Sequence, residues 1–272
     1  IGDADMAPPY RKQNHHHRRM PAMDTRFPEP DVSLVHAIVA RQFPEWAGLE
    51  IRPVDVSGWD NRTFHLGDTL LVRMPSAVHY VAQVEKEQRW LPILSRSISL
   101  SIPMPVAKGM PCAEFPHPWS IYKWLPGESL SSSPDVDQKA LAKSLAEFLR
   151  ELQAIPTTDA PRPGPHCFFR GAHLNVYDAE TQQAITSLAG VVDVDAASTV
   201  WNLALSCPYA GNPVWFHGDI APGNLLQTVG QLSAVIDFGC CGVGDPACDL
   251  AFAWTDLDTD ARECFLSEVG SD

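Results

Sequence analysis

The feature that most constrains this chain is a dense run of carboxylates and turn residues at positions 214–251. The run reads VWFHGDIAPGNLLQTVGQLSAVIDFGCCGVGDPACDLA. A short apolar segment leads into a turn that contains proline and glycine, and two further apolar segments flank a second turn at residues 229–231. This pattern predicts a β-hairpin that carries Asn224 and Asp237 near the same end.

Three residues of this run offer the chemistry of phosphoryl transfer. Asp219 and Asn224 are five positions apart (224 − 219) across a tight loop, which brings both side chains to one pocket. Asn224 and Asp237 supply the hard oxygen atoms that Mg²⁺ takes beside substrate phosphates. Asp219 is not needed for the metal and can accept the proton of a hydroxyl nucleophile. We therefore interpret Asp219 as the catalytic base and Asn224 and Asp237 as the metal ligands.

The same motifs carry a family resemblance. HGDIAPGN, VIDFG and GDPACDLA follow one another as in the aminoglycoside phosphotransferase family, whose members are small-molecule relatives of the protein kinases. The run is also similar to the kinase pattern of an aspartate, an asparagine one loop further on, and an Asp-Phe-Gly. Gly218 stands where protein kinases usually have arginine, which favours the small-molecule branch. The competing interpretation is that His217, Asp219 and Asn224 only cap turns in a hairpin.

The resemblance implies an α+β, bilobal, protein-kinase-like fold. A small lobe would contain a five-stranded antiparallel sheet and a helix, and a larger, mostly helical lobe would carry the catalytic hairpin. We expect a flexible tail over residues 1–30, a nucleotide-binding lobe over residues 31–125 and a catalytic and substrate lobe over residues 126–272. Family members have further helices after the last motif, so the substrate lobe is expected to be shortened or truncated.

Composition and charge narrow the class of protein. The chain has 272 residues, 45% of them apolar, which is enough for a large core. It lacks both the roughly eighteen consecutive apolar residues of a membrane span and the apolar segment of a signal peptide, so we expect a cytoplasmic protein. The formal net charge of −13 argues against nucleic acid as a partner and suits a cationic ligand. Seven cysteines without a CxxC pair predict neither a disulfide framework nor a zinc site.

Alternating apolar segments between turns predict the strands of the small lobe. They cover residues 51–56, 63–66, 69–74, 102–107 and 119–124. Asp31 is the expected N-cap of a helix that precedes them. A second helix is expected over residues 77–91.

The resemblance assigns nucleotide contacts to this lobe. The turn SGWDNRTFHLGD, which contains Gly58 and Asn61, takes the place of the kinase glycine-rich loop, whose backbone amides bind phosphates. Arg73 stands where kinases carry the phosphate-pairing lysine, and its guanidinium can fork onto phosphate oxygens. Of two glutamates on the following helix, Glu85 and Glu87, the register favours Glu87 as the partner of Arg73.

The adenine edge would bind at the end of the last small-lobe strand. Tyr122 and Trp124 lie there, before an expected hinge at residues 125–129. This assignment follows from position within the family pattern. The donor nucleotide is expected to be ATP or GTP, with Mg²⁺ as the cofactor.

The large lobe is expected to be mostly helical. Asp135 and Gln138 resemble a capping box before an apolar stripe that runs to Leu152, and further helices are expected over residues 177–188 and 195–205. Asp245 either contacts a cationic substrate or caps the helix that follows it, and Asp256 is a second acidic candidate for the substrate.

The resemblance gives His217 and Asp249 a supporting role. In the family, an aspartate at the position of Asp249 braces the catalytic loop. We therefore expect Asp249 to stabilise His217 or its neighbours rather than to take part in the chemistry.

Other functions fit the same motifs. The acceptor could be an aminoglycoside, a macrolide in an apolar cleft, or an amino alcohol, amino acid or sugar. A nucleotide-binding module without catalysis is the alternative of another class, suggested by Arg73 and the short C-terminal region. A protein kinase is less favoured, since nothing like an activation loop separates Asp237 from Asp245.

Overall fold

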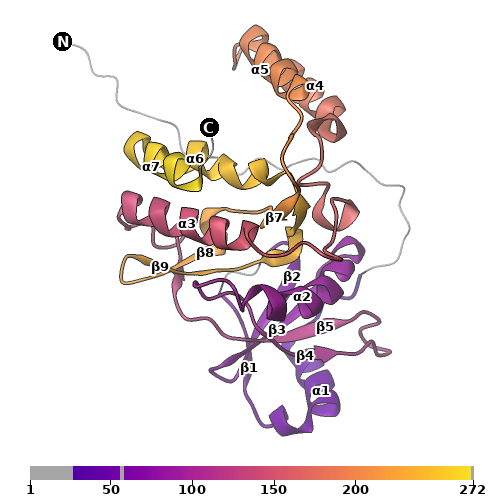
Figure 1. Ribbon diagram of the computed structural model, residues 1–272. Coiled ribbons are helices and arrows are strands. Elements are labelled where there is room, and N and C mark those ends of the chain that lie inside the picture. The colour runs from indigo at the N-terminus through magenta and orange to yellow at the C-terminus, as the bar shows by residue number, and fades with distance from the viewer. Residues whose placement is uncertain (1–26, 56–57, 271–272) are drawn as a thin grey trace, which may run out of the picture.

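The computed structural model describes residues 27–55 and 58–270. Most of the expected tail over residues 1–30 therefore lies outside the described residues, as do Val56, the last residue of the first predicted strand, and Ser57 of the predicted turn. Two lobes are stacked on each other, with a five-stranded sheet in the lower one and most helices in the upper one (Figure 1). None of the helices in the described ranges is long and apolar enough to cross a membrane.

The helices are α1 Val32–Gln42, α2 Val81–Leu94, α3 Gln138–Gln153, α4 Asp178–Ser187, α5 Val194–Ser206, α6 Phe252–Thr255 and α7 Thr259–Val269. The strands are β1 Ile51–Pro53, β2 Asn61–Leu66, β3 Leu70–Pro75, β4 Pro105–Gly109, β5 Trp119–Lys123, β6 Glu128–Ser129, β7 Val214–Phe216, β8 Leu225–Thr228, β9 Gln231–Val235 and β10 Gly242–Gly244. Short 3-10 turns join them, including η3 Pro165–Cys167, η6 Phe238–Cys240 and η7 Pro246–Ala251.

The small lobe is built on the expected antiparallel sheet, with the strand order β1-β2-β3-β5-β4. Asp31 caps α1 as predicted, since its carboxylate accepts from the backbone N–H of Leu34 at 2.8 Å. The apolar face of α1 packs with Phe64, Met74 and Trp119 in the core of this lobe. The predicted fold class is confirmed, and the sheet places Arg73 on a central strand.

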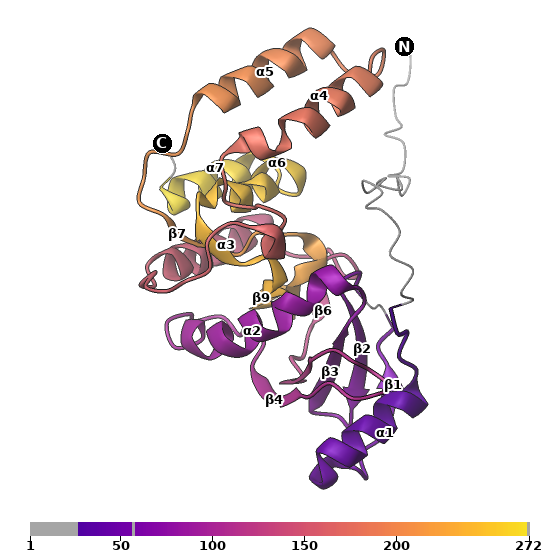
Figure 2. The same ribbon diagram turned by 90° about the vertical axis from the view of Figure 1, so that its right-hand side faces the viewer.

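The second helix differs from the prediction at both ends. The residues that were expected to begin it form a 3-10 turn, Val78–Tyr80, and α2 continues to Leu94. Pro92 lies inside its last turn, where the buried side chains of Leu91 and Leu94 keep the segment packed. The helix lies between the sheet and the upper lobe (Figures 1 and 2).

The large lobe is centred on α3. Its apolar stripe is buried as predicted and packs on α7, β7 and β9. The N-cap, however, is Asp137 and not Asp135: the carboxylate of Asp137 accepts from the N–H of Ala140 at 2.9 Å. A tight turn after Pro134, in which its carbonyl accepts from the N–H of Val136, moves the helix start two residues along.

Part of the expected hinge belongs to a sheet. Glu128 and Ser129 form β6, which pairs antiparallel with β8, and β8 pairs with β9 in the predicted hairpin. The connection between the lobes is thereby tied to the hairpin. A separate antiparallel pair, β7 with β10, lies beside this sheet.

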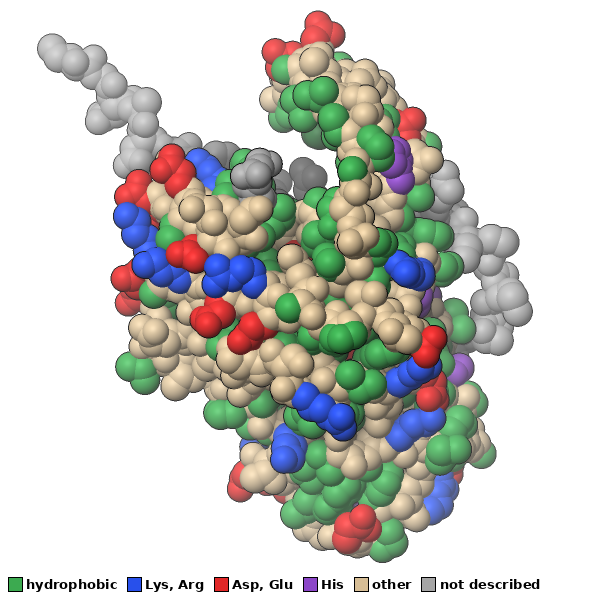
Figure 3. Space-filling view, viewed as in Figure 1, with side chains coloured by type: hydrophobic (Ala, Val, Ile, Leu, Met, Phe, Trp, Pro, Cys, Tyr) green, Lys and Arg blue, Asp and Glu red, His purple; other side chains and the backbone are tan. Residues whose placement is uncertain are grey.

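Helices α4 and α5 form an arm that rises from the rest of the large lobe (Figures 1 and 2). They match the two helices that were predicted in this region. Every side chain of α5 is at least partly exposed. Apolar side chains gather on the arm, and the surface is hollowed between it and the α6–α7 end (Figure 3).

Candidate active site

The loop after β7 is fixed by one buried carboxylate. Asp249, on η7, accepts from the backbone N–H groups of His217 and Gly218, both at 2.7 Å. Burial raises the pKa of Asp249, against the lowering effect of His217 and of the two backbone donors. Gly218 has φ +84°, and a Cβ atom there would lie 2.8 Å from the carbonyl oxygen of Cys240, so glycine is required.

His217 connects this loop to the end of the hairpin. Its Nε2 lies 3.1 Å from the carbonyl oxygen of Ile236, which can only accept, so Nε2 carries the hydrogen. The other ring nitrogen, Nδ1, accepts from the N–H of Asp219 at 3.2 Å. The buried imidazole thus sets the distance between Asp219 and the residue that precedes Asp237.

Asn224 is bound directly to Asp219. Its Nδ2 donates to the carbonyl oxygen of Asp219 at 2.9 Å and to Oδ2 of the same residue at 3.0 Å. The backbone carbonyl of Asn224 accepts from Ile236 at 2.9 Å. The hairpin therefore brings Asp219, Asn224 and the approach to Asp237 together.

Asp237 forms the link to the small lobe. Its Oδ1 accepts from Arg73 at 3.0 Å, and Arg73 also pairs with Glu87 at 3.4 Å. Burial by itself would raise the pKa of Asp237, but the charge and the hydrogen bond of Arg73 outweigh it and lower that pKa. The hydroxyl of Tyr122 donates to the second oxygen of Glu87 at 2.5 Å.

The donor set fits Mg²⁺. Both hydrogen bonds of the Asn224 side chain within the described residues come from Nδ2, which leaves Oδ1 as a hard oxygen donor. Asp237 uses one oxygen for Arg73 and is 23% exposed at its side chain. The described ranges contain no cluster of three or more His, Cys, Asp or Glu residues, so protein ligands would have to be completed by phosphate oxygens and water.

The nucleotide candidates are spread over the small lobe. Asn61 is buried at the start of β2, and a Cβ atom on Gly58 would meet nothing within 4 Å, so crowding does not require glycine there. Tyr122 is 1% exposed, so its side chain belongs to the Arg73 and Glu87 network rather than to an open pocket. Trp124 packs against the ring of His65.

The two acidic substrate candidates differ in their surroundings. Asp245 caps η7, accepting from the N–H of Ala247 at 2.9 Å. It also lines a cavity of about 300 Å³ at the base of the arm, with Gly171, His173 and Tyr209. Asp256 is exposed and accepts from its neighbour Thr255 at 2.6 Å.

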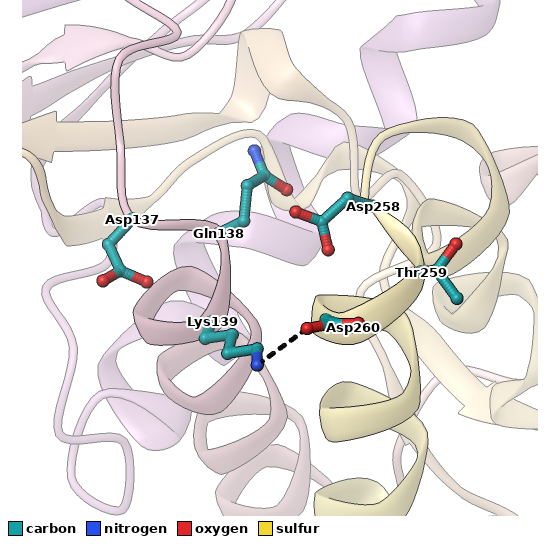
Figure 4. A pocket seen from close by; sticks show the side chains of 6 residues that line it. All are labelled: Asp137, Gln138, Lys139, Asp258, Thr259 and Asp260. Carbon is teal, nitrogen blue, oxygen red and sulfur yellow. Dashed lines mark ion pairs between the residues drawn. The ribbon is translucent and has the colours of Figure 1, made fainter.

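A larger depression, of about 600 Å³, lies between the first turns of α3 and α7 (Figure 4). Its side chains include the ion pair Lys139–Asp260 at 3.0 Å and the two helix caps Asp137 and Asp258. None of the residues that line it belongs to the site described above, so we do not assign it a part in the chemistry.

Three polar residues at the site were missed in the sequence. Arg170 approaches Asp219 to 3.6 Å, Lys86 of α2 reaches the loop after Asp237, and burial together with the charge of Asp237 raises the pKa of Asp60. Arg170 comes from an irregular, proline-rich stretch that has no periodicity to indicate its direction. For Lys86, the only available signal was its place beside Glu87.

The sheet, the interlobe helix and the hairpin with its Asp-Phe-Gly loop define the class of kinase-like folds. Within that class, the model of the phosphotransferase enzyme family matches residues 50–270. The chain belongs to this family, and the resemblance found in the motifs is confirmed.

Individual relatives agree with this assignment. An aminoglycoside 3'-phosphotransferase of Escherichia coli is 32% identical over 129 residues, which are 42% of this chain and 42% of the relative. One from Streptomyces fradiae is 26% identical over 160 residues, 54% of this chain and 56% of the relative. The chain thus matches about half the length of these curated relatives.

Solved structures share the fold at low identity. The GDP complex of wild-type aminoglycoside 2'-phosphotransferase-IIIa has a TM-score of 0.73 at 20% identity, covering 89% of this chain and 84% of that one. A macrolide 2'-phosphotransferase from Brachybacterium faecium has a TM-score of 0.62 at 20% identity, covering 87% and 81%. Similarity of this kind supports the fold alone.

Proposed function

We propose that this chain transfers the terminal phosphoryl group of ATP or GTP to a hydroxyl of a small molecule, with an aminoglycoside as the first candidate. One observation carries the proposal: Asn224 binds the carboxylate of Asp219 on one side and joins the strand that ends at Asp237 on the other. These contacts support the proposal, because phosphoryl transfer needs a base and oxygen ligands for a metal close together.

Each residue has a separate role in this proposal. Asp219 accepts the proton of the acceptor hydroxyl, and the Nδ2 group of Asn224 orients the carboxylate for it. Asn224 Oδ1 and the carboxylate of Asp237 would hold Mg²⁺, which when bound neutralises charge on the phosphates. Arg73 balances the charge of Asp237 and, with Glu87, fixes the small lobe against it.

The lobe boundaries follow from these roles. We propose residues 31–125 as the nucleotide-binding lobe and residues 126–272 as the catalytic and substrate lobe. In this division the donor phosphates would lie beside the Arg73–Asp237 pair and the turn that contains Gly58 and Asn61. Tyr122 supports Glu87, and the backbone near Trp124 takes the adenine or guanine edge. A nucleotide donor at cellular concentration also fits a cytoplasmic location.

A cationic acceptor is supported by one carboxylate in the wall of the cavity at the base of the arm, which Arg162 also lines. Asp245 lines this cavity, and Gly171 in its wall follows Arg170, the partner of Asp219. The chain carries a formal net charge of −13, which favours cations in general. The solved structural relatives include aminoglycoside phosphotransferase complexes with kanamycin and with gentamicin.

A macrolide is the second candidate, and the arm is the observation that favours it. Val200 and Leu203 on α5 are 67% and 64% exposed, and Tyr209 after the helix is 43% exposed. Such an apolar surface suits a large apolar ligand better than a polycation. Macrolide phosphotransferases occur among the structural relatives.

Acceptor-stimulated release of ADP or GDP tests both candidates. The assay would contain Mg²⁺ with ATP or GTP and a panel of aminoglycosides, macrolides and small amino alcohols. Stimulation by one class establishes phosphotransfer and names the acceptor class. Nucleotide binding without stimulated release by any compound would favour a non-catalytic nucleotide-binding module instead.

A further inference from the structure

Lys86 is almost completely buried between the two lobes. It is 8% exposed, although lysine is rarely buried without partners. Gln83 lies three positions earlier on α2 and shares its face of the helix. A Cβ atom on Gly239 would lie 2.8 Å from Cδ of Gln83, so this helix face is in direct contact with the loop after Asp237.

The ammonium group of Lys86 has three acceptors outside its own helix. Nζ lies 2.6 Å from the carbonyl oxygen of Gly239 and 2.9 Å from that of Cys241. Its third neighbour is Nδ1 of His166, at 3.0 Å. Nε2 of His166 donates to the carbonyl oxygen of Arg162 at 2.9 Å, so Nδ1 is the acceptor and all three donors of Lys86 are used.

The loop that Lys86 binds has a strained start. Asp237 has φ +67°, a left-handed conformation that residues other than glycine rarely adopt and that the surroundings must maintain. Arg73 binds its carboxylate from the small lobe at 3.0 Å. Lys86 binds the backbone that follows, at Gly239 and Cys241, so the loop is held on both sides by charged groups of the small lobe.

We propose that Lys86 is a positioning residue, which keeps the loop after Asp237 in the conformation that directs this carboxylate towards the metal and the phosphates. The proposal rests on the phosphotransfer function proposed above. Lys86 and Glu87 are adjacent on α2 and project about 100° apart. Glu87 acts on Asp237 through Arg73, and Lys86 acts on it through the backbone. The position of α2 therefore determines both the side chain and the loop of Asp237.

A lysine that only filled the space between the lobes would have a different effect when it is replaced. Its loss would lower stability throughout the molecule, with no selective effect on the Asp237 loop. A positioning role predicts a local change that precedes global unfolding. The two cases can be separated without any measurement of activity.

Hydrogen exchange of the protein without nucleotide or metal is the first test. Lys86→Met removes the donors and keeps an unbranched side chain. Glu85→Gln is the matched control, because Glu85 lies on the same helix, is 59% exposed at its side chain and pairs with Lys108 on the surface. We expect amides of residues 237–243 to exchange about tenfold faster in the Lys86→Met protein, with no change in the control.

Kinetics supply the second readout. Lys86→Met is expected to lower kcat and to raise the Mg²⁺ concentration for half-maximal rate, each by about tenfold, with the acceptor KM changed less than about twofold. Lys86→Arg keeps a charged donor and should restore part of both losses. If the methionine variant does not fold, His166→Ala removes one of the three acceptors and should change the same amides by a smaller factor.

Several results would overturn the proposal. They are unchanged exchange at residues 237–243, an equal acceleration throughout the protein, and a loss that falls only on the acceptor KM. If the wild-type chain transfers no phosphoryl group to any acceptor, the proposed function fails. The exchange comparison would still decide the role of Lys86, because it needs neither donor nor acceptor.

Discussion

The hairpin that carries Asn224 and Asp237 and the α4–α5 arm are built in opposite ways. At the hairpin, polar side chains are fixed by backbone groups, as Asp249 is by His217 and Gly218 and as Asn224 is by Asp219. On the arm, each side chain of α5 has some exposure, and the helices rise from the lobe. In the proposed function, the chemistry would therefore lie in a part of the molecule that hydrogen bonds fix, and the acceptor would meet a more exposed part.

The largest effect on activity is expected when the proposed catalytic base, Asp219, is replaced. Asp219→Ala should lower kcat by about 10²- to 10⁴-fold, the usual contribution of a positioned general base. The dissociation constant for the nucleotide, measured by calorimetry, should change less than about threefold, because Asp219 is not assigned to the donor. A parallel loss of nucleotide binding would contradict this division of roles.

Removal of the buried Asp249 carboxylate should lower the free energy of unfolding. Asp249→Ala leaves two buried N–H groups, of His217 and Gly218, without their acceptor, at a cost of about 1–3 kcal/mol for each unsatisfied group. Urea unfolding of the two proteins measures the difference. The exposed cap Asp137 provides a matched control, since Asp137→Ala should cost only about 1 kcal/mol. Equal losses in the two variants would mean that the hairpin loop is no more tightly fixed than an ordinary helix end.

The pairing of Arg73 with Asp237 should show in the pH dependence of stability. The pKa of Asp237 is lowered in the fold, so its stabilising contribution is present above the ordinary carboxyl pKa of about 4 and is lost as the pH falls through the lowered value. The free energy of unfolding should therefore differ most between wild type and Arg73→Met near neutral pH, and the difference should shrink below about pH 4. A difference that is constant from pH 3 to pH 7 would exclude the ion pair as its source.

The smallest effect on stability is expected on the arm. Leu203→Ser replaces a side chain that is 64% exposed, so the free energy of unfolding should change by no more than about 0.5 kcal/mol. If the arm contacts the acceptor, the KM for an active macrolide should rise while the KM for the nucleotide stays constant. A change in the nucleotide KM alone would show that the arm takes no part in recognising the acceptor.

Sequence reasoning succeeded where contacts are local. Asn224 and Asp237 flank one hairpin and Asp219 lies in the loop just before it, so turns and apolar segments were sufficient to place them near one end. The first three strands of the small lobe were predicted for the same reason, because turns join them in sequence, whereas the other two were predicted from apolar segments further along the chain. Asp31 was recognised as a cap because the N–H group from which its carboxylate accepts lies only three residues away, on Leu34.

Sequence reasoning failed where the two residues of a contact lie far apart in the chain. Lys86 and Gly239 are 153 positions apart, and no periodicity of α2 shows which loop its buried face meets. Arg170 reaches Asp219 from an irregular segment, whose direction depends on the whole lobe. The prediction of Asp135 as the helix cap was wrong for a more local reason. The turn after Pro134 determines where the helix can begin, and the cap is Asp137.

Phosphorus NMR of a reaction with Mg²⁺, ATP or GTP and the acceptor that stimulates turnover tests the central claim most directly. The wild-type chain should convert the terminal phosphate signal into a phosphomonoester on the acceptor, together with the nucleoside diphosphate. Asp219→Asn, examined in parallel, should form almost none of this product while it still binds the nucleotide. Release of inorganic phosphate alone, or the same phosphomonoester at the same rate from the variant, would contradict the assignment of the hairpin as the site of phosphoryl transfer.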